Sequence, residues 1–185
     1  MSQDENTEAE RSGDGLTRRQ ALGYGSALAG GAAAVALAQA APAEAAGHRG
    51  SLELRSVSLA QANRLVNAAV SYVRDTPGLP PMFVLVVDAC GDEKASKRMD
   101  GNGPASVALV PTKARTSLAF RSSTADFARR TTDPARIASF VAAGFSLLGG
   151  GRPIVEDGQV IGAIGVGGGS PEQDDQVAAA ALEAL

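Results

Sequence analysis

The chain has 185 residues, a formal net charge of −3 at pH 7 and a single cysteine. After position 45, acidic and basic residues are equal in number, which argues against nucleic acid or an anionic lipid surface as a partner. Because Cys90 has no second cysteine to pair with, the chain forms no internal disulfide and must be stabilised by packing or by assembly.

The first 45 residues have the pattern of an export signal. Residues 1–15 are polar and lack an apolar period, so we expect them to be disordered. Arg18 and Arg19 then precede a weakly apolar run of alanine and glycine that ends in A-x-A sites, as in a twin-arginine signal. A membrane anchor would need about 20 strongly apolar residues, and the glycines dilute this run too far. We expect cleavage after Ala45 and export to the periplasm or the extracellular space.

We expect a flexible linker over residues 46–55 and one domain over residues 56–185. The domain opens with Ser58-Leu-Ala-Gln61, a capping-box pattern, followed by apolar residues at helical spacing through position 73. After the turn-forming DTPGLPP, the run MFVLVVDA (82–89) predicts a buried strand. A Gly-Asp turn then leads into EKASKRM (93–99), which predicts a polar strand with an exposed face.

The middle of the chain predicts helices. The loop GNGP (101–104) precedes a helix over 105–120, in which Pro111 should cause a kink or a break because proline lacks a backbone N–H. Two short helices are predicted at 125–130 and 134–142, the second capped by Asp133 with proline in its first position. The apolar residues 145–148 are a candidate for a further strand.

The C-terminal part predicts a hairpin and a helix. PIVE and QVIGAIGV flank Asp157-Gly158, one of the strongest hairpin signals, and an alanine-rich helix follows over 171–185. The whole order fits an α+β domain whose helices pack on an antiparallel sheet.

The glycine run before the last helix invites comparison with a phosphate-binding loop. GVGGGS (165–170) lacks the last glycine of the dinucleotide fingerprint and the lysine of a P-loop. Ser170 and Gln173 already fit a capping box, and the acids of the first helical turn would repel a phosphate. The sequence therefore argues against nucleotide binding. We expect Gly162 and Gly165 to let a neighbouring helix or subunit approach the sheet closely.

Three segments together resemble a known family. They are VVDACGDEKASKRMDG (86–101), PASVALVPTKARTSLAF (104–120) and GGRPIVEDGQVIGAIGVGGGSPEQDDQVAAAALEAL (150–185). In order and spacing they are similar to the small haem-binding domains of the GlcG/HbpS type, and the resemblance covers nearly all of residues 56–185. The sequence departs from the family pattern at Pro111 and in the polar second strand.

The resemblance implies a single profilin-like α+β domain, with a five-stranded antiparallel sheet and helices on its faces. It implies a homo-oligomer, often an octamer. Functions associated with the family are haem or iron binding, haem degradation, redox sensing with a membrane sensor kinase, and accessory roles in glycolate or corrinoid metabolism. The cofactor that the resemblance implies is haem.

The resemblance also assigns residues. Those matched as structural motif are Gly91, Gly101, Gly162, Gly165, Gly168, Gln173 and Asp174. Those matched as candidates for ligand binding are Asp88, Arg98, Asp100, Lys113 and Thr116. The polar members of this set admit two interpretations. Arg98 and Lys113 can hold a carboxylate of haem or of a small hydroxy acid, or Arg98 pairs with Asp100 across a turn while Lys113 is solvated.

Haem iron normally takes histidine, cysteine, methionine or tyrosine as axial ligand, and this chain offers few of them. His48 is the only histidine and lies in the linker, and we interpret Cys90 as a plain or redox-sensitive thiol. We interpret Met99 as a core residue and Tyr72 as a surface aromatic. Haem binding would then be weak, through a hydroxyl such as that of Thr116, or peripheral.

The sequence contains no arrangement of catalytic residues that we can defend. Its one histidine lies outside the domain, so neither a serine nor a cysteine triad can form, and no His/Cys metal cluster is present. Loose iron binding by Glu172, Asp174 and Asp175 is the remaining metal hypothesis. The primary prediction is an exported, oligomeric haem- or tetrapyrrole-binding or redox-sensing domain. The alternatives are a small enzyme or accessory protein acting on a carboxylate such as glycolate, and a purely structural assembly unit.

Overall fold

The computed structural model describes residues 53–185, so the predicted export signal, its cleavage site and His48 lie outside the described residues. Helices and strands follow one another in the order α1 (Leu59–Asp75), β1 (Phe83–Asp88), β2 (Glu93–Arg98), α2 (Ala105–Phe120), α3 (Thr124–Arg130), α4 (Pro134–Ala142), β3 (Gly151–Glu156), β4 (Gln159–Gly167) and α5 (Pro171–Leu182). This confirms the predicted order and the α+β class.

The sheet has four antiparallel strands in the order β2-β1-β4-β3, not the five that the family resemblance implied. The candidate strand at 145–148 is a loop. The backbone N–H of Ser146 donates to the hydroxyl of Thr116 at 2.8 Å, so it bonds to a helix side chain and not to a strand. The predicted hairpin at Asp157-Gly158 is confirmed, with both residues at positive φ.

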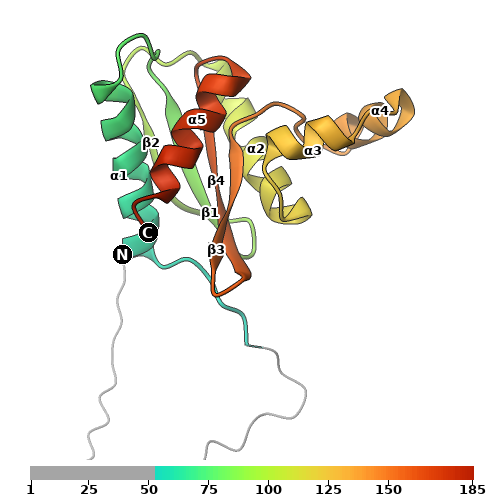
Figure 1. Cartoon of the computed structure of the whole chain (residues 1–185), viewed down its shortest axis with the longest axis horizontal. Coiled ribbons are helices and arrows are strands. Elements are labelled where there is room, and N and C mark those ends of the chain that lie inside the picture. Colours follow the sequence, from blue (N-terminus) through green and yellow to red (C-terminus); the bar gives the residue numbers. More distant parts are fainter. Residues whose placement is uncertain (1–52) are drawn as a thin grey trace, which may run out of the picture. The chain divides into compact units, whose positions relative to one another are not determined.

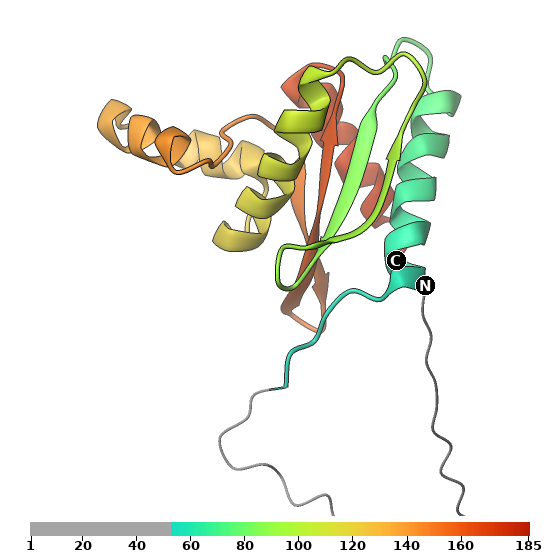
Figure 2. The ribbon, with the colours of Figure 1, turned by 180° about the vertical axis from the view of Figure 1, so that it is seen from behind.

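Helices cover both faces of the sheet. Helices α1 and α5 pack on one face, where the larger apolar core includes Leu65, Val84, Ile164 and Val177. Helix α2 packs on the other face over a smaller cluster that includes Leu85 and Val110. Figure 1 shows α5 in front of the sheet, and Figure 2, which views the molecule from the opposite side, shows α2 in front of it. Strand β2 is an outer strand without a buried residue, as its polar sequence predicted.

Helix α2 runs from Ala105 to Phe120 without a break, so the predicted split at Pro111 is wrong. Proline removes the N–H that would bond to the carbonyl of Val107. Val107 is 46% exposed, and water can satisfy a carbonyl on that face. The loss therefore does not interrupt the helix.

Helices α3 and α4 extend away from the sheet (Figure 1). Four phenylalanines pack together at their base: Phe120, Phe127, Phe140 and Phe145, with ring centroids between 4.1 and 6.3 Å apart for the contacting pairs. Helix α4 itself has no buried residue. Together the two helices form an arm, which we call the α4 arm (residues 124–142), and the aromatic cluster holds it to the body.

Of the two glycines predicted to admit a close neighbour, Gly165 faces a helix, whereas Gly162 faces the neighbouring strand β1 and Val57, which precedes α1. A Cβ on Gly165 would lie 2.6 Å from the carbonyl oxygen of Val110, so glycine lets α2 lie directly on the sheet. The start of α5 carries the predicted capping box between Ser170 and Gln173. Among the described residues, no helix combines the length and the apolar character that a membrane crossing requires.

Candidate ligand pocket

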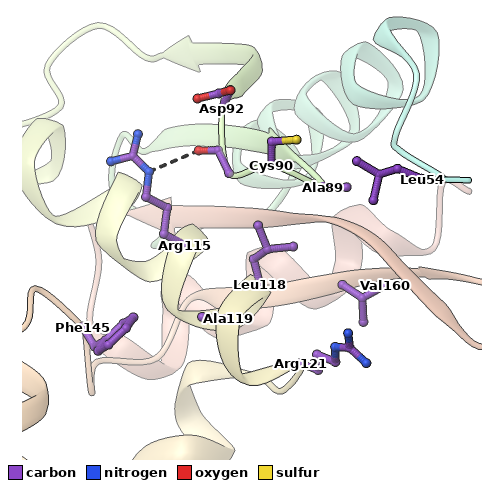
Figure 3. A pocket seen from close by; sticks show the side chains of 11 residues that line it. Leu54, Ala89, Cys90, Asp92, Arg115, Leu118, Ala119, Arg121, Phe145 and Val160 are labelled. Carbon is purple, nitrogen blue, oxygen red and sulfur yellow. Dashed lines mark hydrogen bonds between the residues drawn. The ribbon is translucent and has the colours of Figure 1, made fainter. Parts of the chain in front are cut away.

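A large cavity lies between the β1–β2 turn and the C-terminal half of α2. It has a volume of about 700 Å³, within the range of small-molecule sites. We call it the Cys90 pocket, and Figure 3 shows its lining: Leu54, Ala89, Cys90, Gly91, Asp92, Arg115, Leu118, Ala119, Arg121, Phe145 and Val160. The wall is thus partly apolar and partly charged.

Arg115 of α2 and Arg121 at the C-terminal cap of that helix give the pocket its positive charge, and Asp92 adds one carboxylate to the lining. The Nε of Arg115 donates to the carbonyl oxygen of Gly91 at 3.2 Å, which leaves the terminal nitrogens of the guanidinium available. Arg121 ends α2 in a left-handed conformation with φ of 49°, and among the described residues its side chain has no hydrogen-bonded partner. Leu118 lies between them in Figure 3. An apolar ligand with anionic groups fits such a lining, because arginine binds carboxylates with two parallel hydrogen bonds.

Cys90 is exposed at the tip of the β1–β2 turn. Asp88 holds that turn: its Oδ1 accepts from the backbone N–H of Cys90 at 2.9 Å and from that of Asp92 at 3.2 Å. Asp88 therefore positions the thiol, while its own carboxylate is not part of the lining. Among the described residues, Cys90 is the one side chain of the pocket that belongs to the usual axial ligands of haem.

The structure does not bring the five predicted ligand residues together. Arg98 pairs with Phe83 at the start of β1, whereas Asp88 ends that strand. Five residues of strand separate the two positions, roughly 17 Å at the usual rise per residue. Both Arg98 and Asp100 line a different cavity beside α1, of about 360 Å³. Within residues 53–185, Arg98 and Asp100 are both exposed and form no ion pair with each other, so the predicted pair is wrong.

Lys113 is buried, so the interpretation of a solvated lysine is wrong. Its Nζ donates to Asp174 Oδ2 at 2.6 Å and to the carbonyl oxygen of Val166 at 3.1 Å. The two charged side chains are each 3% exposed. Burial raises the pKa of Asp174 above its ordinary value, and the hydrogen bond and charge of Lys113 only partly offset this effect. Asp174, assigned to a structural motif from the sequence, is thus the partner of a candidate site residue.

Thr116 is fully buried and its hydroxyl is occupied. It donates to the carbonyl oxygen of Thr112 at 2.6 Å and accepts from the backbone of Ser146. An iron ligand at this position would have to displace both bonds. Met99 packs against the larger core, as predicted, while Tyr72 is half-buried and accepts a hydrogen bond from Gln176 at 2.7 Å.

The acids at the start of α5 have separate partners. Asp175 forms a two-point ion pair with Arg152, and Asp174 pairs with Lys113. Within residues 53–185, no three His, Cys, Asp or Glu side chains group in a way that could hold a metal ion. The hypothesis of iron binding by Glu172, Asp174 and Asp175 therefore finds no site.

The sequence analysis overlooked Arg115 and Arg121. A signal was present, since Arg115, Leu118 and Ala119 have the spacing of one helical face, and all three line the pocket. What the sequence could not supply was the approach of the β1–β2 turn, which closes this face into a cavity.

Relatives of known structure share this fold. A double mutant of HbpS from Streptomyces reticuli is 30% identical, with a TM-score of 0.66 over 79% of this chain and 97% of that one. A haem complex of PduOC is also 30% identical, with a TM-score of 0.64 over 70% of this chain and 95% of that one.

The corrinoid adenosyltransferase PduO of Salmonella typhimurium is 31% identical over 133 residues, and the match spans 70% of this chain but only 39% of that protein.

A family model described as haem degrading protein HbpS-like matches residues 57–183, which is nearly the whole described domain. Because this model matches most of the chain and the fold is that of HbpS, the chain belongs to the HbpS-like family.

Proposed function

We propose that this chain is an exported haem- or tetrapyrrole-binding domain, and that the ligand binds in the Cys90 pocket. The observation that carries the proposal is the lining, in which two guanidinium groups and a thiol surround the apolar side chains of Leu118 and Val160. The haem complex of PduOC, at 30% identity, supports the ligand class.

The lining residues fit the parts of a haem. Arg115 and Arg121 would hold the propionates, Leu118 and Val160 would contact the ring, and Cys90 would face the iron. Bound haem would supply an iron whose oxidation state and ligands can change. The turn held by Asp88 keeps the thiol at the pocket.

This arrangement also supports redox sensing. An exposed thiol beside cationic side chains is the type of cysteine that oxidants modify. Its oxidation would change both the charge and the ligand chemistry of the pocket. A membrane sensor kinase is the kind of partner that would read such a change in an exported protein.

We further propose that the domain assembles with copies of itself. Val141 of the α4 arm is 58% exposed, and Leu109 and Leu148 beside it are 41% and 44% exposed. These three residues line an apolar hollow of about 270 Å³. Exposed apolar surface of this kind is typical of a protein interface, and a second copy of the same arm is an occupant of matching chemistry.

A haem titration of the full-length chain tests the primary proposal. We expect a saturable Soret band with a stoichiometry of one haem per chain, and a shifted band maximum in Cys90→Ser if the thiol faces the iron. Thermal unfolding with hydroxy acids, followed in parallel, tests the alternative of a carboxylate-binding accessory protein. Absence of a saturable band would overturn the primary proposal.

A further inference from the structure

A second cavity of about 300 Å³ lies at the other end of α2, beside the glycine run that leads into α5. We call it the Lys113 pocket, and it shares no lining residue with the Cys90 pocket. Its lining is Gly103, Ala105, Ser106, Leu109, Lys113, Leu148, Gly167, Gly168, Gly169, Pro171 and Asp174. Haem binding in the Cys90 pocket does not require this cavity.

The lining offers two hydrogen-bond donors without an acceptor among the described residues. The ammonium of Lys113 has three N–H groups, of which Asp174 and the carbonyl of Val166 account for two. The hydroxyl of Ser106 accepts from the side-chain amide of Asn102 at 3.2 Å, and its own proton has no described acceptor. Each donor is nearly buried, so water reaches it poorly.

Asn102 fixes one of these donors in place. Its Nδ2 carries two N–H groups, and three acceptors lie within hydrogen-bond distance of it: Ser106 Oγ and the carbonyl oxygens of Pro81 and Gly167, the latter two at 2.9 and 3.2 Å. Because the amide nitrogen is not an acceptor, the hydroxyl proton of Ser106 is not used in this contact and is left for another group. The Oδ1 of Asn102 is a buried acceptor that finds no partner in the described part of the chain. Polar groups around this cavity are therefore incompletely paired.

The electrostatic setting favours an anion. Helix α2 begins at the cavity without a side-chain cap, so its positive end faces the wall, whereas the start of α5 is already capped by Ser170 and Gln173. The only acidic residue of the lining is Asp174, and both its oxygens are bonded, to Lys113 and to the backbone N–H of Gly169. Leu109 and Leu148 add an apolar side to the same cavity.

We propose that the Lys113 pocket binds a short-chain carboxylic acid in its anionic form, as a site separate from the haem pocket. Its carboxylate accepts from Lys113 Nζ and Ser106 Oγ, while Leu109 and Leu148 contact the alkyl chain. This size and polarity exclude haem from the cavity and suit a small metabolite.

The test is a titration of the ¹⁵N-labelled, full-length, haem-free chain with butyrate at constant ionic strength, followed by NMR. We expect saturable shifts of the amides of Ser106 and Gly167–Gly169, with a Kd on the order of millimolar. Butyramide, which has the same shape without the charge, should bind at least about tenfold more weakly, because hydrogen bonds to charged groups are the stronger ones. Equal binding of the two, or shifts that sodium chloride reproduces, would overturn the proposal.

Two variants change the affinity in opposite directions. Ser106→Ala should weaken butyrate about tenfold, since it removes one charge-assisted hydrogen bond. Asp174→Asn should strengthen it, because the cation of Lys113 is then no longer neutralised. Arg64→Ala, which removes an exposed arginine of α1 outside both pockets, is the matched control and should leave butyrate affinity unchanged. If the chain binds butyrate but not haem, the proposed carboxylate site is supported although the haem proposal fails. If Ser106→Ala binds butyrate as tightly as the unaltered chain, the carboxylate site is refuted.

Discussion

Lys113 of α2 and Asp174 of α5 form an ion pair of 2.6 Å whose side chains are each 3% exposed. The pair joins two helices that cover opposite faces of the sheet. Gly150 makes room for it, since a Cβ there would lie 2.7 Å from Asp174 Cβ and 3.2 Å from Lys113 Nζ. A polar contact in the interior thus connects the two layers that the apolar clusters build separately.

Removing one partner of this pair should be costly. Lys113→Met leaves a buried carboxylate without its cation, and we expect a loss of about 3–5 kcal/mol in the free energy of unfolding. The double variant Lys113→Met, Asp174→Leu removes both charges and should recover most of that loss. Urea unfolding of the three proteins measures both effects. If the double variant is as unstable as Lys113→Met, the unpaired charge of Asp174 is not the cause of the lost stability.

The pH dependence of stability should carry the signature of Asp174. Burial raises the pKa of this carboxyl in the folded state above its unfolded value of 3.8. Between these two pKa values the folded chain holds a proton that the unfolded chain has released. The free energy of unfolding should therefore fall as the pH rises through this window. In urea unfolding from about pH 4 upward, the free energy of unfolding of Asp174→Asn should not show this decrease. If the unaltered chain and Asp174→Asn depend on pH in the same way, the raised pKa of Asp174 is contradicted.

A methyl group at Gly165 should separate α2 from the sheet. Its Cβ would lie 2.6 Å from the carbonyl oxygen of Val110, which belongs to the helix backbone and cannot turn away. We expect Gly165→Ala to lower the free energy of unfolding by about 1–3 kcal/mol, the usual cost of overpacking. Gly103→Ala is the control, because its Cβ would meet no atom within 4 Å. Equal stabilities in thermal unfolding would show that the close approach is not needed.

Assembly through the α4 arm should be sensitive to charge at its apolar surface. Val141→Glu places a carboxylate on the exposed side of α4 and should shift the full-length chain to smaller species in analytical ultracentrifugation. Val155→Glu is the control, since Val155 is 53% exposed on β3 and does not line the hollow at the α4 arm. Unchanged sedimentation of Val141→Glu would place the interface elsewhere.

Much of the fold follows from the sequence because local signals and burial agree. The capping boxes at Ser58 and Ser170 and the turn at Asp157-Gly158 all form as predicted. At Pro111 the predicted break does not occur, since the helix continues through the proline and Val107, whose carbonyl loses its partner, is partly exposed. The predicted fifth strand does not form for another reason. Of the apolar residues 145–148, Phe145 packs in the aromatic cluster, and all four line the hollow beside the α4 arm.

The candidate site was harder to predict than the fold. Lys113 looked like a surface lysine because its partner lies 61 residues away in the sequence, and only folding brings Asp174 to it. The family resemblance grouped Arg98 with Asp88 as ligand candidates, but antiparallel pairing places them at opposite ends of the β1–β2 hairpin. Sequence motifs located the residues that build the domain, whereas the pockets arise from contacts between elements distant in the chain.

The export hypothesis can be tested on the chain itself. Arg18→Lys and Arg19→Lys together preserve the charge but remove the twin-arginine pattern, and should retain the protein in the cytoplasm of the producing cell. Cell fractionation with detection of the C-terminal domain measures the distribution. Equal amounts of the variant and the unaltered chain outside the cytoplasm would contradict the proposal.

The most direct test of the central claim, that haem binds in the Cys90 pocket, is a Soret titration of one pair of variants. Arg115→Ala with Arg121→Ala removes both guanidinium groups of the pocket, and haem affinity should fall at least about tenfold, since each group binds a carboxylate through charge-assisted hydrogen bonds. Arg98→Ala, at the opposite end of the β1–β2 hairpin, should bind haem as the unaltered chain does. If Arg98→Ala loses haem while the double arginine variant keeps it, the haem site lies beside α1 and not in the Cys90 pocket.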